Sequence, residues 1–112
     1  TTNTRVSANK TDGKYYELEQ VIILKGKEAR LEDGKLAGSV LKLNDAVKNV
    51  MEFTGSDFIT TIKYATENPA KNLGLFEIMG SIKENKLANL VVVDKDLNVY
   101  QTIRRGKVIY NK

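Results

Sequence analysis

The stretch Leu31-Glu32-Asp33-Gly34-Lys35-Leu36-Ala37-Gly38-Ser39 separates strand-like sequence from the longest helix-periodic segment of the chain. Asp33-Gly34 is a turn signal. The residues at 36–39 then carry so little side-chain bulk that backbone N–H and C=O groups can come close to another body. We expect a tight strand-to-helix junction at 36–39. The body that it approaches is either the protein core or a ligand.

Before this stretch, the sequence predicts two or three short strands joined by glycine turns. Asp12-Gly13 is a turn signal, and residues 15–18 and 20–24 are rich in aromatic and β-branched side chains. Gly26 interrupts the run, and residues 28–31 alternate again. These segments indicate a β-hairpin layer with one solvated face.

After it, the apolar residues recur at three and four positions, which predicts a helix at about 40–54 that ends at Gly55. Ser39 or Asn44 is its candidate N-cap. Helical sequence at 56–74 follows, and we expect a break before Pro69, since a residue before proline avoids the α conformation. A short turn with Pro69 at its first helical position then runs to Gly74.

The last third of the chain predicts a three-stranded meander at 90–93, 99–103 and 107–110. The first of these strands is Leu-Val-Val-Val, which is apolar on both faces, so we expect it in the centre of a sheet. Three cations, Arg104, Arg105 and Lys107, lie at the final turn. They are typical of protection against edge pairing rather than of a phosphate site.

Composition limits the classes of function. The 112 residues are 41% hydrophobic and 29% charged, which is typical of one folded domain. No apolar run approaches the roughly 20 residues that span a bilayer. The net charge is +4, but the basic residues are dispersed among acids, so we expect no nucleic-acid partner. We also expect no membrane partner and a soluble, unexported, cytoplasmic protein.

The chain has no cysteine and no histidine. It therefore offers no disulfide, no thiol nucleophile, no imidazole base and neither of the commonest zinc ligands. We expect no metal site in this segment. Ser39 is better read as a cap or pocket hydroxyl than as a nucleophile, because the chain holds no base that could activate it.

Four motifs together resemble the C-terminal third of bacterial N-acetylglucosamine-6-phosphate deacetylases of the amidohydrolase superfamily. The motif around Asn68-Pro69 and the motif Gly80-Ser81-Ile82 are shared by much of the superfamily, whereas the motif that contains Leu36-Ala37-Gly38-Ser39 narrows the likeness to the deacetylases. The motifs are Glu32-Asp33-Gly34-x-Leu36-Ala37-Gly38-Ser39, Asn44-Asp45-Ala46-Val47-x-Asn49, Ala65-Thr66-x-Asn68-Pro69-Ala70-x-x-Leu73-Gly74 and Gly80-Ser81-Ile82.

The resemblance implies an α+β segment from the C-terminal end of a (β/α)8 barrel. Residues 1–79 would be the terminal barrel portion, and 80–112 part of a small β domain. It implies a carbon–nitrogen hydrolase that converts N-acetylglucosamine 6-phosphate to glucosamine 6-phosphate and acetate. A divalent metal of zinc or iron type would be bound by residues upstream. Leu36, Ala37, Gly38 and Ser39 would line the substrate pocket. We expect a homo-oligomer, most simply a dimer, and no activity from this segment alone.

Three positions depart from the family pattern. The family's eighth barrel strand ends in Thr-Asp-Ala, where the Asp is the general base and acid, but Asn3 stands at that position here. A carboxamide cannot take a proton from water at neutral pH. The homologue is impaired, the position was altered, or the short terminal match is accidental. Asn85 and Asn89 replace a usual Gly and Asp, and we expect both to preserve their turns.

Two other classes of protein share some of these features. A dihydroorotase-like or hydantoinase-like amidohydrolase would share the tail but not Leu-Ala-Gly-Ser. A noncatalytic β-rich binding or assembly module would retain the sheets without the chemistry.

Overall fold

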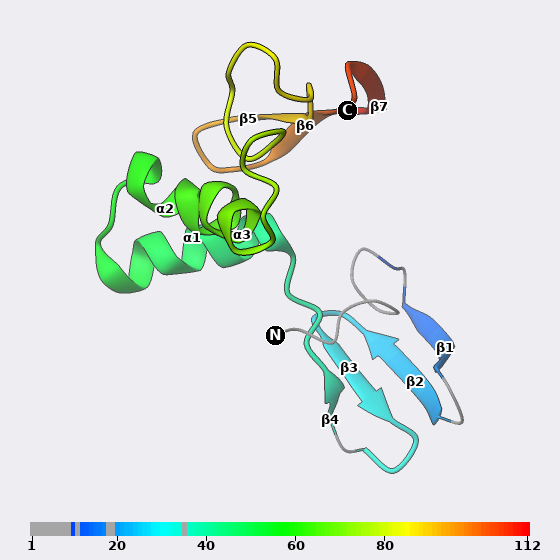
Figure 1. The fold of residues 1–112 in the computed structure, drawn as a ribbon. Coiled ribbons are helices and arrows are strands. Elements are labelled where there is room, and N and C mark those ends of the chain that lie inside the picture. The colour runs from blue at the N-terminus through cyan, green and yellow to red at the C-terminus, as the bar shows by residue number, and fades with distance from the viewer. Residues whose placement is uncertain (1–9, 11, 18–19, 35) are drawn as a thin grey trace. The chain divides into compact units, whose positions relative to one another are not determined.

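The computed structural model describes residues 10, 12–17, 20–34 and 36–112. The chain divides into two compact units, residues 1–42 and 43–112. The first holds a β-sheet, and the second holds three helices and another sheet (Figure 1).

Four antiparallel strands form the sheet of the first unit, in the order β1-β2-β3-β4. They are β1 (Gly13–Glu17), β2 (Gln20–Lys25), β3 (Glu28–Leu31) and β4 (Leu36–Gly38). The predicted hairpin layer is confirmed. The expectation that 36–39 only joins a strand to a helix is wrong, because a turn at Gly34 folds Leu36–Gly38 back onto β3 as an edge strand. The Gly34 N–H closes that turn by donating to the Leu31 carbonyl over 3.0 Å.

The core of this unit lies on one face of the sheet. Leu24 and Ala29 are 3% and 1% exposed, and they face each other across the β2–β3 pair. Partly buried apolar side chains pack around these two from the neighbouring segments, namely Tyr15, Leu31, Ala37 and Val40. Removing this apolar surface from water holds the strands together.

In the second unit, α1 (Leu43–Thr54) begins three residues later than the predicted start at residue 40. Val40 instead packs against the core of the first unit. Neither candidate cap serves this helix. The Ser39 hydroxyl accepts from the Leu41 N–H, and the Asn44 side chain donates to the Leu97 carbonyl over 3.0 Å. Gly55 follows the helix with φ of 71°, as predicted for a C-terminal cap.

Helix α2 (Phe58–Ala65) is capped by Asp57, whose carboxylate accepts the Thr60 N–H over 2.9 Å. It ends three residues before the predicted stop at Asn68, and α3 (Glu67–Asn72) follows at once. The prediction that Asn68 caps a turn with Pro69 first is wrong, because Pro69 is the third residue of α3. Proline is tolerated there since the first N–H groups of a helix have no helical partner.

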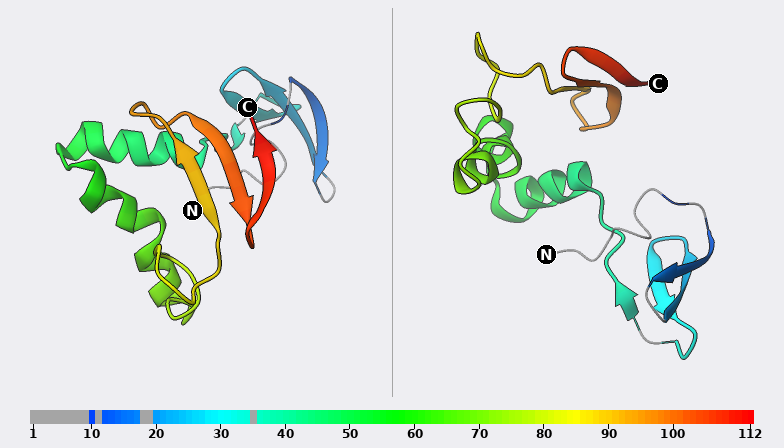
Figure 2. Two further views of the ribbon diagram at one scale, coloured as in Figure 1. Left: turned by 90° about the horizontal axis from the view of Figure 1, so that it is seen from above. Right: turned by 45° about the vertical axis from the view of Figure 1, so that its right-hand side comes forward.

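The sheet of the second unit is the predicted three-stranded meander, with β5 (Leu90–Val93), β6 (Val99–Arg104) and β7 (Lys107–Asn111) pairing antiparallel in sequence order (Figure 2). The central position predicted for β5 is wrong, since β5 is an edge strand of this sheet. Val91 and Val92 are 56% and 47% exposed. An apolar pattern on both faces indicates that both faces can be covered, but it does not specify the strand order.

The turn between β5 and β6 contacts α1 through Leu97. This side chain is 7% exposed although its backbone is left-handed, with φ of 63°. Asp94 holds the turn, because its carboxylate accepts the N–H groups of Asp96 and Asn98. Hydrogen bonding by Asn98 lowers the pKa of Asp94. Burial of Leu97 thus offsets the strain of a conformation that leucine rarely adopts.

The segment between α3 and β5 folds back on α3. Gly80, with φ of 101°, approaches Ala70 so closely that an added Cβ would lie 2.6 Å from the Ala70 Cβ and 3.2 Å from the Thr66 carbonyl oxygen. The Lys86 ammonium donates to the Phe76 carbonyl and the Ser81 hydroxyl and lies 3.6 Å from the Phe76 ring centroid.

The two asparagine replacements keep their turns, as predicted. Asn85 adopts the left-handed conformation that glycine usually supplies, with φ of 69°. The Asn89 side chain accepts the Arg105 N–H over 2.9 Å. Among the described residues, no helix is long and apolar enough to cross a bilayer.

We predict that Gly80→Ala lowers the free energy of unfolding by about 2–4 kcal/mol, because the new methyl group collides with Ala70 while the backbone is left-handed. Gly106→Ala is the matched control. Its φ is 78°, but nothing lies within 4 Å of the added Cβ, so about 1 kcal/mol is expected. Urea unfolding of both variants measures the difference. Equal losses would contradict the close approach at Gly80.

We predict a contribution of Asp57 to stability that is present above about pH 4 and is lost as the pH falls further. Hydrogen bonds from Thr60 lower the pKa of Asp57 in the folded chain, so the unfolded chain takes up the proton first and folding weakens. Asp57→Asn keeps a capping oxygen but does not titrate. Thermal unfolding between pH 7 and 2 should therefore show a smaller acid loss in this variant, and identical pH profiles would contradict the prediction.

Candidate functional site

The residues predicted to line a pocket come together on β4 and just after it. Leu36, Ala37 and Gly38 form the strand, and Ser39 follows directly. Because β4 is at the edge of its sheet, one side of its backbone does not pair within that sheet. An edge of this kind presents N–H and C=O groups to whatever lies beside it. The arrangement can therefore bind a polar ligand through backbone hydrogen bonds.

A β-bulge interrupts the pairing at this strand. Ala29 pairs with Gly38 and Arg30 pairs with Leu36, so Ala37 has no partner position on β3. Its side chain packs against Leu24 and Ala29 in the core. A bulge bends the strand and changes the direction of the groups beyond it, and bulges are common next to binding sites.

Arg30 is the charged residue beside the bulge. Its Nη1 donates to the Gly34 carbonyl oxygen over 2.8 Å, and its Nε donates to the Glu28 carboxylate over 2.9 Å. The hydrogen bond from Arg30 lowers the pKa of Glu28, and the Glu28 carboxylate raises the pKa of Arg30. Both groups are therefore charged at neutral pH. Sequence motifs do not identify Arg30, because its role depends on the turn and not on a sequence spacing.

Ser39 has a local structural role. Its hydroxyl oxygen accepts the N–H of Leu41 over 3.1 Å, which shapes the chain as it leaves β4. The residue is half-buried. The hydroxyl thus shapes a turn and does not cap the helix, and its hydrogen can still donate elsewhere, so a pocket role for Ser39 stays a prediction.

Asn3, at the position of the family's general base, lies outside the described residues, so its role stays a prediction.

The described residues do not fit a metal site. Within them, no group of three or more His, Cys, Asp or Glu side chains comes together. The sequence has no histidine and no cysteine, the ligand types that zinc prefers.

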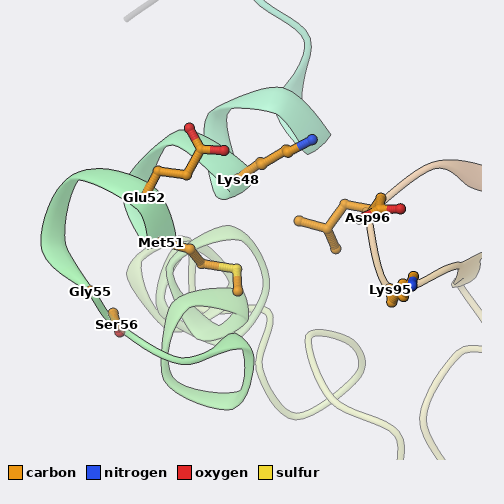
Figure 3. A pocket seen from close by; sticks show the side chains of 8 residues that line it. Lys48, Met51, Glu52, Gly55, Ser56, Lys95 and Asp96 are labelled. Carbon is orange, nitrogen blue, oxygen red and sulfur yellow. The ribbon is translucent and has the colours of Figure 1, made fainter.

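A separate shallow pocket of about 290 Å³ lies in the second unit, between the C-terminal half of α1 and the β5–β6 turn. Figure 3 shows Lys48 and Glu52 on the helix, and Lys95 and Asp96 on the turn. Two of its lining residues are cationic and two anionic, around the apolar side chains of Met51 and Leu97. This mixture selects no ligand charge. The helical spacing of its α1 residues is visible in the sequence, but their meeting with residues 95–97 is not.

Comparisons with known proteins place this chain in a family. The profile of the amidohydrolase family matches residues 17–109. An N-acetylglucosamine-6-phosphate deacetylase from Bacillus subtilis is 39% identical over 99 residues, which are 88% of this chain and 25% of that protein. An N-acetylgalactosamine-6-phosphate deacetylase from Escherichia coli O157:H7 is 34% identical over 107 residues, which are 96% of this chain and 28% of that protein.

Solved structures agree. The crystal structure of an N-acetylglucosamine-6-phosphate deacetylase from Thermotoga maritima superposes with a TM-score of 0.77 at 40% identity, over 95% of this chain and 29% of that one. The chain thus spans between a quarter and a third of these three relatives. Because the family profile covers most of the sequence, and proteins named as deacetylases match in both sequence and structure, this chain belongs to the amidohydrolase family.

Proposed function

We propose that this chain is a segment of a hydrolase that removes the acetyl group from N-acetylglucosamine 6-phosphate. The observation that carries the proposal is the 39% identity to the B. subtilis deacetylase over 88% of the chain. The T. maritima structure supports the same substrate. These matches favour a deacetylase over a dihydroorotase-like or hydantoinase-like enzyme and over a noncatalytic module.

The contribution of this segment is a wall of the substrate pocket. The sugar phosphate is rich in hydroxyl and phosphate oxygens, which need hydrogen-bond partners when they leave water. The unpaired backbone side of β4 (Leu36–Gly38) can supply some of these partners, and the Ser39 hydroxyl can add one more. Small side chains at 37–39 let the ligand approach this backbone closely.

The catalytic position of this segment is Asn3. Its carboxamide can align water or substrate by hydrogen bonds, but it cannot accept the proton that amide hydrolysis requires a base to remove. In this proposal, residues outside the described part of the chain bind the divalent metal that the family implies. The isolated segment is inactive.

A second substrate is favoured by one specific observation. The E. coli relative that matches 96% of this chain is named for N-acetylgalactosamine 6-phosphate. The two sugars differ only in the orientation of one ring hydroxyl, so a wall built from backbone groups does not by itself separate them. The domain boundary at residues 79/80, the homo-oligomeric state and the cytoplasmic location stay predictions.

The proposal is tested in a chimera in which this chain replaces the matching part of the B. subtilis deacetylase. We predict that Asn3→Asp raises kcat of the chimera about 100-fold or more, because it restores a general base. Release of acetate from both acetylated sugar phosphates measures activity and preference. The chimera without the substitution is the matched control.

No deacetylation of either sugar by the Asn3→Asp chimera, if it folds, would contradict the proposed function. Equal turnover with and without the substitution would show that the base lies elsewhere. The 112-residue chain alone, with or without Asn3→Asp, should release no acetate.

We predict that Ala37→Leu disturbs both the core and the pocket wall. The larger side chain cannot fit against Leu24 and Ala29, so the free energy of unfolding should fall by about 1–3 kcal/mol. In the active chimera the KM should rise about tenfold, which corresponds to about 1.4 kcal/mol of lost binding. Ala88→Leu, at an exposed position, is the control and should change stability by no more than about 0.5 kcal/mol. An unchanged KM in Ala37→Leu would contradict the pocket-wall role.

A further inference from the structure

We propose that Arg30 is a positioning residue for substrate binding. Arg30 fixes the direction in which the chain leaves the Gly34 turn, and this direction places the backbone of β4. The inference rests on the proposed function, because β4 is the substrate-contacting strand in that proposal. Arg30 acts through the backbone and does not itself touch the substrate.

The hydrogen bond to Gly34 is the central observation. The Gly34 N–H already closes the turn onto Leu31, but that bond does not by itself fix the orientation of the Gly34 carbonyl and its peptide plane. Glycine at φ of 86° has little steric preference there. The bond from Arg30 Nη1 to the Gly34 carbonyl oxygen, 2.8 Å long, fixes this plane. The plane sets the path into β4.

The ion pair with Glu28 holds the guanidinium in place for this bond. Arg30 Nε donates to the Glu28 carboxylate on the same strand. One nitrogen of the planar guanidinium is therefore held by Glu28 while another, Nη1, donates to the turn. A guanidinium can serve two acceptors at fixed angles, which an ammonium cannot do. Glu28 therefore orients Arg30, and Arg30 orients the turn.

The position of Arg30 in the sheet gives this bond its consequence. Arg30 pairs with Leu36 at the point where the register shifts and Ala37 is left without a partner. A strand that slips by one residue exchanges its two faces and its two edges. A loosened turn would thus change which backbone groups of β4 face the ligand. By fixing the turn, Arg30 selects the bulged register.

The first test is amide hydrogen exchange of the 112-residue chain. Arg30→Met should speed exchange of the amides in β4 about threefold to tenfold, the effect of losing one solvent-exposed hydrogen bond. Amides of the paired residues Lys14 and Ile23 in β1 and β2 should not change. Glu28→Gln keeps an oxygen that can accept the Arg30 Nε–H, so Arg30 stays oriented toward Gly34 and exchange in β4 should stay within about twofold of the unaltered chain. Arg104→Met is the matched control on another strand and should leave β4 unchanged.

The second test is kinetic, in the Asn3→Asp chimera. Arg30→Met should raise the KM for N-acetylglucosamine 6-phosphate about threefold to tenfold and change kcat less than twofold, since a displaced wall weakens binding without altering the base. Arg30→Lys, which keeps the charge but not the fork, should recover only part of the KM. If Arg30→Met does not fold, Arg30→Lys is measured in its place in both tests.

Unchanged exchange in β4, or an equal acceleration in β1 and β2, would overturn the positioning role. Faster exchange in β4 with an unchanged KM would overturn its link to the substrate. If the chimera with Arg30 intact is inactive, the proposed function has failed, and exchange in β4 alone decides whether Arg30 fixes the strand.

Discussion

The turn at Gly34 is the constraint on which the candidate site depends. It reverses the chain so that Leu36–Gly38 pairs with β3, and two hydrogen bonds define its geometry, one from the Gly34 N–H and one to its carbonyl oxygen from Arg30. The bulge at Ala37 and the outward edge of β4 follow from this reversal. In the first unit, Gly34 thus makes the turn because glycine is conformationally flexible, and the Arg30 guanidinium restricts that flexibility by hydrogen bonding.

The buried core of both units is small relative to the apolar side chains that they carry. Among the described residues, the buried side chains are Leu24, Ala29, Val47, Thr61, Ala70 and Leu97. Much larger groups remain outside, including Phe53 at 81% exposed and Ile82 at 88%. Extensive apolar surface of this kind usually marks contact with other protein. The chain spans only 25% of its B. subtilis relative, so covering surface in that protein would come from the rest of its structure.

Some predictions from the sequence were wrong for identifiable physical reasons. The Leu-Val-Val-Val pattern of β5 indicates that apolar contact is favourable on both faces of the strand. Nevertheless, β5 is an edge strand of its sheet here. Val40 continues the helical spacing of α1 but packs with the first sheet, because tertiary contacts override a periodicity signal of a single residue. Pro69 lies inside α3 rather than at its start, since a helix tolerates a missing N–H anywhere in its first turn.

The sequence by itself determined the β, helical and β segments of the chain, the closing meander, the turn-forming role of Asn85 and the membership of the family. These features depend on the local spacing of residue types and on short motifs, both of which can be identified from the sequence. Tertiary structure alone decided that Leu36–Gly38 is a strand, that Ala37 is bulged, that Leu97 is buried in a left-handed turn and that Arg30 reaches Gly34. Each of these depends on pairing, or on side-chain reach across a turn, and such contacts leave no periodic signal in the chain.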